Sequence, residues 1–301
     1  MNNLPLVTIG AINYNNAKFV METLESIRAQ SYPNIELVIV DDCSTDNSAE
    51  IIDTWLKHYE KPFKYIRHEQ NLGICATCND VIKFSSGKYI STIATDDIMM
   101  PYKIALQVDL LKQSDNTVGA VYSDAYLINE DSSLMKGLFI ERYRCFATKP
   151  TGFIYENLIE SNFLPAMSLM VKKECYNEVG FFDEDLVFED YDMWLRISKK
   201  YKILYSEYIS AKYRIRNNSL MSVTRNWDTS TIKILFKHLK ESPFLINRLE
   251  DLGVGSYCNN DRASILSLKP AATFSFKLKI IMLLHYLKVP KIIGLFILKR
   301  I

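Results

Sequence analysis

The feature that most constrains the fold of this chain is the regular alternation, over residues 6–94, of short apolar runs with segments of helical period. The runs at 6–12 and 35–40 are rich in β-branched residues and end in polar turns, as buried strands do. Between them, apolar residues recur every three or four positions from residue 20 to residue 27, which is typical of a helix. Strands that alternate with helices require right-handed crossovers, so the sequence predicts an α/β fold with a mostly parallel, Rossmann-like sheet flanked by helices.

The remaining elements follow the same pattern as far as residue 97 and then become less regular. We expect a helix around 51–59, capped by Ser44 or Thr45, and a second helix that follows residues 71–73, runs through 81–84 and ends near 86–87. Strands are expected at 63–67 and 88–94. Further elements are predicted at 102–113 (helix), 118–123 (strand), 167–172 (strand), 190–200 (helix) and 203–216 (one or two strands). Segment 129–149 is polar without a clear period, and the chain reads as helical from residue 227. These patterns predict one α/β domain over 1–222 and a helical region over 223–301.

Composition excludes several classes of protein. The 301 residues, 48% of them hydrophobic, can bury one large core, and a net charge of +1 gives no whole-molecule field that would attract nucleic acid. Six scattered cysteines indicate reduced thiols in a cytoplasmic protein. The first residues lack a secretory signal, and no apolar run reaches the length of a membrane-spanning helix.

Polar residues stand where three of the predicted strands end. Asp41 and Asp42 follow the second strand, residues 71–73 (Asn-Leu-Gly) follow the third, and Asp96 and Asp97 follow the fourth. The carboxyl ends of parallel strands share one edge of a sheet, where ligands bind. Adjacent carboxylates at such an edge suit a divalent cation that bridges to a diphosphate.

Each of these residues also has a purely structural interpretation. An isolated Asp pair is more often a helix cap, here at Asp41 or Asp46, and Asp97 could be a solvated turn residue. Cys75 and Cys78 have the spacing of a zinc or redox pair but no matching second pair, so packing is favoured. The four histidines, His68 among them, show no catalytic or metal-ligating arrangement in the sequence.

Five motifs, in this order along the chain, favour the functional interpretation of these residues over the structural one. Together they resemble the family 2 glycosyltransferases, whose nucleotide-binding domain has the GT-A fold. The resemblance covers about residues 5–222 and is of the bacterial envelope-polysaccharide type. The motifs are VTIGAINYNN (7–16), IELVIVDDCSTD (35–46, with Cys43 at the family's Gly position), NLG (71–73) with SGKYI (86–90), ATDDIMMP (94–101) and FEDYDMWLR (188–196).

The resemblance implies a role for each matching position. Asp190, beside Glu189, would be the catalytic base. Asp96 and Asp97 would hold Mg²⁺ or Mn²⁺ against the diphosphate. The nucleotide would be bound by Ile12, Asn13, Tyr14, Asp41, Asp42, Asn71, Gly73, Thr95, Asp96 and Arg216.

Two positions depart from the family pattern. Ala94 stands where the metal segment often has another Asp, and Arg216 stands where the family often has His. An Arg can bind phosphate but not a metal ion.

The implied function is inverting transfer of a hexose or N-acetylhexosamine from a nucleotide-sugar, with a UDP-sugar favoured, to a saccharide or lipid-linked saccharide acceptor. Capsule, O-antigen or lipooligosaccharide synthesis is the expected setting. The alternative is a catalytically impaired nucleotide-sugar-binding module of the same fold. A dehydrogenase or nucleotidyltransferase is disfavoured because the first turn, INYN, lacks a Gly-rich phosphate loop.

The C-terminal segment 276–301 has an unusual charge distribution. No acidic residue follows Asp261, whereas eight basic residues do. The segment combines basic residues with large apolar residues, and its helical pattern is interrupted once, at Val289-Pro290. Two interpretations stay open at this stage: a peripheral contact with the cytoplasmic face of the inner membrane, or a helical hairpin packed on the α/β domain with solvated lysines.

Overall fold

The computed structural model describes residues 4–143, 148–216, 227–240, 242 and 245–301. The chain forms two compact units, the first made of residues 1–185 with 189–217 and the second of residues 186–188 with 218–301. The boundary that the sequence predicts, between residues 222 and 223, lies within 217–226 and so outside the described residues.

The first unit is built on one mixed sheet with the strand order β3-β2-β1-β4-β8-β6-β9-β5 in the described residues, and β7 pairs with β6. The strands β1, β2, β3 and β4 are mutually parallel, and β6 is parallel to β9. Antiparallel pairing brings in β8, β7 and β5. The strands are β1 (Val7–Asn13), β2 (Ile35–Asp41), β3 (Phe63–Arg67), β4 (Tyr89–Ala94), β5 (Ile98–Met99), β6 (Val118–Ile128), β7 (Leu134–Leu138), β8 (Met170–Lys172) and β9 (Lys202–Arg214).

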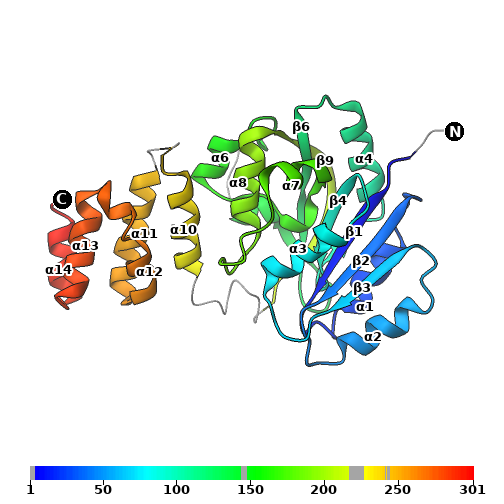
Figure 1. Ribbon diagram of the computed structural model, residues 1–301, viewed down its shortest axis with the longest axis horizontal. Coiled ribbons are helices and arrows are strands. Elements are labelled where there is room, and N and C mark those ends of the chain that lie inside the picture. Colours follow the sequence, from blue (N-terminus) through cyan, green and yellow to red (C-terminus); the bar gives the residue numbers. More distant parts are fainter. Residues whose placement is uncertain (1–3, 144–147, 217–226, 241, 243–244) are drawn as a thin grey trace. The chain divides into compact units, whose positions relative to one another are not determined.

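Helices connect and cover these strands. Every residue of β1 and β2 is buried, as expected of strands covered on both faces. Helices α1 and α2 pack together beside this half of the sheet, whereas α3 contacts β1 and β2 (Figure 1). The helices of this unit are α1 (Val20–Arg28), α2 (Ser48–Leu56), α3 (Ile74–Phe84), α4 (Lys103–Gln113), α5 (Phe139–Tyr143), α6 (Tyr155–Glu160), α7 (Lys173–Val179) and α8 (Asp190–Lys200).

The predicted α/β class and its flanking helices are confirmed, and three details differ from expectation. Strand β6 continues to Ile128, five residues further than predicted, because β9 pairs with it along its length. Strand β8 starts at Met170 because a 3₁₀ turn occupies Ala166–Ser168. The segment without a clear period, 129–149, contains β7 and α5, whose mostly exposed residues show no alternation of polar and apolar side chains.

The second unit is helical over its described residues. Asp261 and Ser275 cap α12 and α13 by accepting backbone N–H groups of their first turns. Among the described helices, none combines the length and the apolar composition that a bilayer crossing requires. The helices are α10 (Trp227–His238), α11 (Leu245–Asn259), α12 (Arg262–Ser267), α13 (Phe276–Tyr286) and α14 (Lys291–Leu298).

Candidate active site

The candidate site lies where the strand order reverses, between β1 and β4. The chain runs outward from β1 through β2 to β3 and then returns to β4 on the other side of β1. Such a reversal leaves a crevice at the carboxyl ends of the strands. The register pairs Asn13 with Asp41 and Ile12 with Ala94, so the loops that follow β1, β2 and β4 leave the sheet side by side.

Buried polar side chains join these three strand ends. The Asn13 amide donates to Asp41 Oδ2 (3.1 Å) and to Ser44 Oγ (3.1 Å), and its Oδ1 accepts from the Thr95 hydroxyl (2.5 Å). Thr95 Oγ1 in turn accepts from the Asn16 amide (3.1 Å). Asn13, Asp41 and Thr95 are all at most 1% exposed. These three predicted nucleotide-binding residues therefore form the floor that fixes the loops above it.

The turn after β2 places Cys43, which stands at the family's Gly position, in a backbone conformation that glycine favours. Cys43 has a φ of +61°, a left-handed conformation that glycine adopts without strain. Helix α2 begins at Ser48, and the N–H of Ser48 donates to Asp46 Oδ1 (3.0 Å). Asp46 therefore accepts a backbone N–H of the first turn of α2, and the prediction of Ser44 or Thr45 as the cap is wrong. The Ser44 hydroxyl instead accepts from the backbone N–H of Asn15 (2.9 Å).

Asp42 holds the loop 71–73 against the end of β2. Its carboxylate accepts the backbone N–H groups of Leu72 (2.7 Å) and Gly73 (2.9 Å), and its carbonyl accepts from the Asn71 amide (3.3 Å). Gly73 has a φ of +87°, and no atom lies within 4 Å of the position a Cβ would take. The Asp42 side chain is buried, so most of its acceptor capacity is already used within the protein.

His68, directly after β3, bridges two carboxylates. Its Nδ1 lies 2.8 Å from Asp42 Oδ1 and its Nε2 lies 2.9 Å from Asp80 Oδ2. Both ring nitrogens can donate only when the ring is an imidazolium. Burial by itself lowers the pKa of His68, but the hydrogen bonds and charges of Asp42 and Asp80 outweigh it and raise the pKa above its ordinary value.

This bridge predicts a pH-dependent contribution to stability. Because the pKa of His68 is raised by folding, its contribution is complete below the ordinary histidine pKa of about 6.5 and is lost as the pH rises through the folded-state value. We expect His68→Gln to lower the free energy of unfolding by about 1–3 kcal/mol at pH 6 and by clearly less at pH 9. Urea denaturation of wild type, His68→Gln and the exposed-site control His58→Gln measures this. An equal loss at both pH values would argue against the charged bridge.

Asp96 and Arg216 form an ion pair at the position predicted for the metal. Arg216 Nη1 lies 2.7 Å from Asp96 Oδ2 and also donates to Asn16 Oδ1 (2.6 Å). Both side chains are about one-fifth exposed. Asp97, in contrast, is 3% exposed and accepts the backbone N–H of Arg214 (2.9 Å). Burial, together with the negative charge of Asp96, raises the pKa of Asp97 well above its usual range.

These residues fit a divalent ion in one respect only. Mg²⁺ is commonly held by one or two carboxylates while substrate phosphates and water supply the other oxygens. Asp96 is accessible enough for that role, whereas the buried Asp97 carboxyl already has a partner. Within the described ranges no group of three or more His, Cys, Asp or Glu could hold a metal ion. The chain thus offers one carboxylate with a guanidinium beside it.

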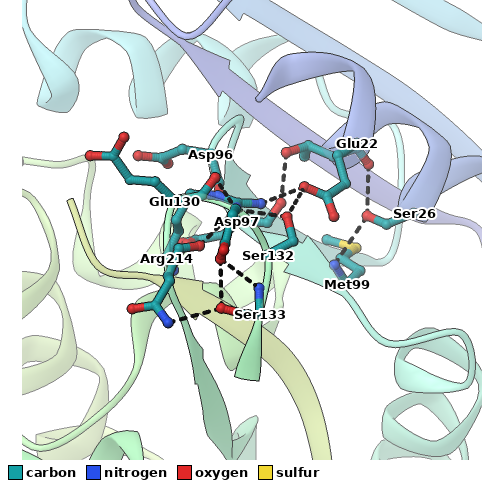
Figure 2. A network of polar contacts seen from close by, with 12 residues as sticks. Glu22, Ser26, Asp96, Asp97, Met99, Glu130, Ser132, Ser133 and Arg214 are labelled. Atoms are coloured by element: carbon teal, nitrogen blue, oxygen red, sulfur yellow. Dashed lines mark hydrogen bonds and ion pairs between the residues drawn. The ribbon is translucent and has the colours of Figure 1, made fainter. Parts of the chain in front are cut away.

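Arg214 organises the segment that carries Asp96 (Figure 2). It is 2% exposed, and its Nε donates to the Asp96 carbonyl (2.7 Å). Its Nη1 donates to the Asn129 carbonyl (3.0 Å) and to Ser132 Oγ (2.9 Å), and its Nη2 pairs with Glu22 Oε2 (2.5 Å). One buried side chain therefore ties the loop after β4 to the turn between β6 and β7 and to α1.

Glu189 and Asp190 lie at the start of α8, and the loop before them is anchored by α3. Asn79 donates to the Phe182 carbonyl (3.0 Å) and accepts the Phe182 N–H (2.8 Å). Asp190 Oδ2 accepts from the Asn162 amide (3.2 Å). Burial raises the pKa of Asp190 to about 6. Burial and then the charge of Asp190 raise the pKa of Glu189 to about 8.

Electrostatic interactions indicate that the predicted carboxylates gather. Burial raises the pKa of Tyr213, and the negative charges of Asp97, Asp96 and Asp190 raise it further, so all three act on one phenol. Helix α3 starts at the loop 71–73 that Asp42 holds, so this helix links Asp42 to the part of the site that contains Glu189. The pKa of Cys75 on α3 is raised to about 12 by burial and then by the charge of Glu189. Cys75 is thus a buried residue of α3.

Four residues of this site have no role in the sequence-based prediction: Asn16, His68, Asn162 and Arg214. The position of His68 directly after β3 is a signal in the sequence, because Asp42 likewise follows β2. Asn16 ends the first motif, and Arg214 lies two residues before Arg216. Asn162 lies 28 residues from its partner Asp190 and carries no local signal.

Comparisons with known proteins agree with this geometry. Residues 8–169, more than half of the chain, match the family described as Glycosyl transferase family 2. An uncharacterized glycosyltransferase of Rickettsia felis is 33% identical over 221 residues, which are 71% of this chain and 35% of the relative. The chain thus spans about a third of the length of that relative.

Other relatives are matched over most of their length. An uncharacterized glycosyltransferase of Methanocaldococcus jannaschii is 28% identical over 78% of this chain and 81% of the relative. The Escherichia coli UDP-Glc:alpha-D-GlcNAc-diphosphoundecaprenol beta-1,3-glucosyltransferase WfgD is 26% identical over 74% of this chain and 84% of the relative.

Solved structures support the fold. Staphylococcus aureus TarS 1–349 in complex with UDP-GlcNAc superposes with a TM-score of 0.60 at 16% identity, over 94% of this chain and 92% of that one. The mannosyltransferase PcManGT of Pyrobaculum calidifontis, in complex with GDP-Man and Mn²⁺, gives a TM-score of 0.60 at 15% identity over 95% and 85%. The chain therefore belongs to family 2 of the glycosyltransferases and has the GT-A fold of these enzymes.

Proposed function

We propose that this glycosyltransferase transfers a hexose or N-acetylhexosamine, with inversion, from a UDP-sugar to a saccharide or lipid-linked saccharide acceptor. The reaction would take place at the cytoplasmic side of the membrane, in capsule, O-antigen or lipooligosaccharide assembly. The observation that carries the proposal is the match of residues 8–169 to Glycosyl transferase family 2, in a chain that places Asp96 beside Arg216 after β4 and Asp190 at the start of α8. The E. coli relative WfgD, a glucosyltransferase with a UDP-Glc donor and a diphosphoundecaprenol-linked acceptor, supports the choice of substrates.

The nucleotide base would lie above the floor formed by β1 and β2. Tyr14 and Leu72 are each 46% exposed at the two loops that border this floor. Apolar and aromatic side chains with free faces suit a planar base. The open space beside Gly73 would accept the nucleoside. Asp42 and Asn71 would act mainly by fixing the 71–73 loop, and one acceptor position of Asp42 Oδ2 would be left for a base N–H.

The diphosphate would bind at Asp96 and Arg216. The Arg216 guanidinium presents several donors in a plane, a geometry that matches phosphate oxygens. Asp96 would hold the divalent ion, Mg²⁺ or Mn²⁺, which when bound supplies positive charge that stabilises the departing diphosphate. Asp97 would keep Asp96 in place through its bond to the Arg214 N–H rather than contact the ion.

Asp190 would take the proton from the acceptor hydroxyl as the hydroxyl attacks the anomeric carbon. A base works best when its pKa lies near the working pH, and burial places the pKa of Asp190 at about 6. Asn162 orients the carboxylate through Oδ2. One base and a single displacement leave no covalent sugar intermediate, and the anomeric configuration is inverted.

The alternative is a nucleotide-sugar-binding module with impaired catalysis. One observation favours it: Arg216 already neutralises the only accessible carboxylate at the predicted metal position. Release of nucleoside diphosphate from a panel of nucleotide-sugars, with Mn²⁺ and with a candidate acceptor, separates the two. Turnover with a UDP-sugar supports the enzyme, whereas UDP binding without any turnover supports the module.

Two substitutions test the diphosphate site. Asp96→Ala should weaken UDP binding in Mn²⁺ by at least about tenfold, because it removes a charged ligand, and should not weaken binding without metal. Arg216→Gln should instead weaken metal-free UDP binding, because Gln cannot bind phosphate as a cation. Calorimetric titration of UDP with and without Mn²⁺ measures both. Titrations of Asp96→Ala that match those of wild type in Mn²⁺ would refute the metal assignment.

A further inference from the structure

Helix α14 presents large apolar side chains to solvent on most of its circumference. Its sequence is Lys-Ile-Ile-Gly-Leu-Phe-Ile-Leu, and only Gly294 and Leu298 are buried. Ile292 is 85% exposed and Phe296, one turn later, is 57% exposed. Residues four apart lie on one helix face, so these two side chains form part of a continuous apolar strip. A helix that is apolar on nearly all sides is ordinarily covered.

The buried side of α14 is fixed, which determines the exposed side. A Cβ on Gly294 would lie 2.2 Å from the Tyr257 hydroxyl of α11, so only glycine allows the two helices to approach this closely. The same hydroxyl donates to the Val289 carbonyl (2.7 Å), in the turn before α14. With Gly294 facing α11, the Ile292 and Phe296 strip points away from the helical unit's own core.

The neighbouring helix α13 extends this apolar surface. Leu278, Ile281 and Leu284 face the core of the unit, whereas the large residues at its C-terminal end are exposed. Helices α13 and α14 contact each other. We define the C-terminal apolar surface as Leu283, Tyr286, Leu287, Ile292, Ile293 and Phe296.

Basic side chains accompany this surface, and residues 262–301 contain no acidic side chain. Lys288 and Lys291 stand at the turn between the two helices and are exposed, as are Lys299 and Arg300 at the end of α14. The Arg300 guanidinium lies over the Phe296 ring, 4.1 Å from its centre. Long basic side chains can bury their stems beside apolar groups and keep their charges at the headgroup level.

The charge pattern distinguishes between possible occupants. A two-fold contact between copies of this chain would bring two sets of basic residues together without any acidic partner from residues 262–301, which is unfavourable. An anionic lipid surface attracts each basic residue by about 1 kcal/mol and accepts the apolar side chains between the headgroups. We propose that the C-terminal apolar surface seats this protein on an anionic lipid bilayer.

Vesicle sedimentation of the full chain tests the proposal without donor or acceptor, so its result is independent of transfer activity. We expect binding to phosphatidylcholine vesicles that contain phosphatidylglycerol, weaker binding in high salt, and little binding to phosphatidylcholine alone. The double variant Ile292→Glu/Phe296→Glu should reduce the partition coefficient by at least about tenfold, because it replaces two apolar side chains that would be buried in the bilayer with negative charges. Leu134→Glu, at a 63% exposed site on β7, is the matched control and should bind as wild type does.

Three results would overturn the proposal. The first is wild-type protein that does not sediment with the anionic vesicles. The second is a double variant that sediments as well as wild type does, while circular dichroism shows both to be folded. The third is a wild-type dimer, detected by light scattering, that is absent in the double variant, with no vesicle binding by either protein. That outcome would make a second copy of the chain the occupant.

Discussion

Asp190→Asn is expected to lower kcat by at least about 10²-fold and to leave UDP affinity nearly unchanged. A general base typically contributes 10²–10⁴-fold, and an amide cannot accept the proton of an attacking hydroxyl. The substitution keeps the size of the side chain and its place at the start of α8, so the contact with Asn162 can persist. Initial-rate kinetics with the donor found in the nucleotide-sugar screen, together with UDP titration, separate the catalytic effect from binding.

The pH profile provides a second readout of the same residue. The base is active when ionised, so kcat/KM of wild type should rise through an apparent pKa near 6 and level off above it. Glu189→Gln is the matched control: it removes the adjacent carboxyl, whose pKa is about 8, and should keep most of the activity at pH 7. If Asp190→Asn keeps the wild-type kcat, Asp190 is not the base. If Glu189→Gln causes the larger loss of activity, Glu189 is the base instead.

Arg214→Met is expected to lower the free energy of unfolding by about 2–3 kcal/mol. The Asp96 carbonyl would lose its donor. The Asn129 carbonyl would keep the Ser132 N–H, and the partly exposed Glu22 carboxylate would keep the Ser132 hydroxyl. Met keeps the stem volume but has no N–H, so the loss reports the hydrogen bonds rather than a cavity. Denaturant unfolding of the full chain measures it.

Arg216→Met is the control for this prediction. It lies two residues away and also carries a guanidinium, but its side chain is about one-fifth exposed and water can replace its contacts. We expect a smaller loss, of about 1 kcal/mol, because water reaches this partly exposed ion pair. Equal losses for the two variants would mean that Arg214 does not organise the loop after β4 in the way described.

The half of the fold that precedes residue 97 could be predicted because its signals are local. Each buried strand is one apolar run, and each helix between strands shows its own period; β3 has the bounds that the sequence indicates, Phe63–Arg67. A parallel sheet then places the residues after β1, β2 and β4 at one edge, so the convergence of Asp41, Asp42 and Asp96 required no knowledge of side-chain contacts.

The rest of the sheet depends on pairing between segments far apart in the chain. The antiparallel insertion of β8 between β4 and β6 places residues 81 and 83 positions apart side by side, and no local pattern in the sequence indicates it. The bridge of His68 to Asp42 and Asp80 is likewise set by the approach of β2, β3 and α3. No local pattern in the sequence indicates that Arg214 is buried, because its burial depends on the pairing of β9 with β6 and on its contacts with Glu22 and Ser132.

The most direct test of the central claim is a crystal structure of the full chain with UDP and Mn²⁺. We expect the diphosphate against Arg216 and Asp96, the base beside the Asp42-bound loop, and the Asp190 carboxylate facing the same cleft from the side opposite the diphosphate. UDP bound at another place, or Asp190 directed to a surface that the diphosphate does not border, would contradict the account.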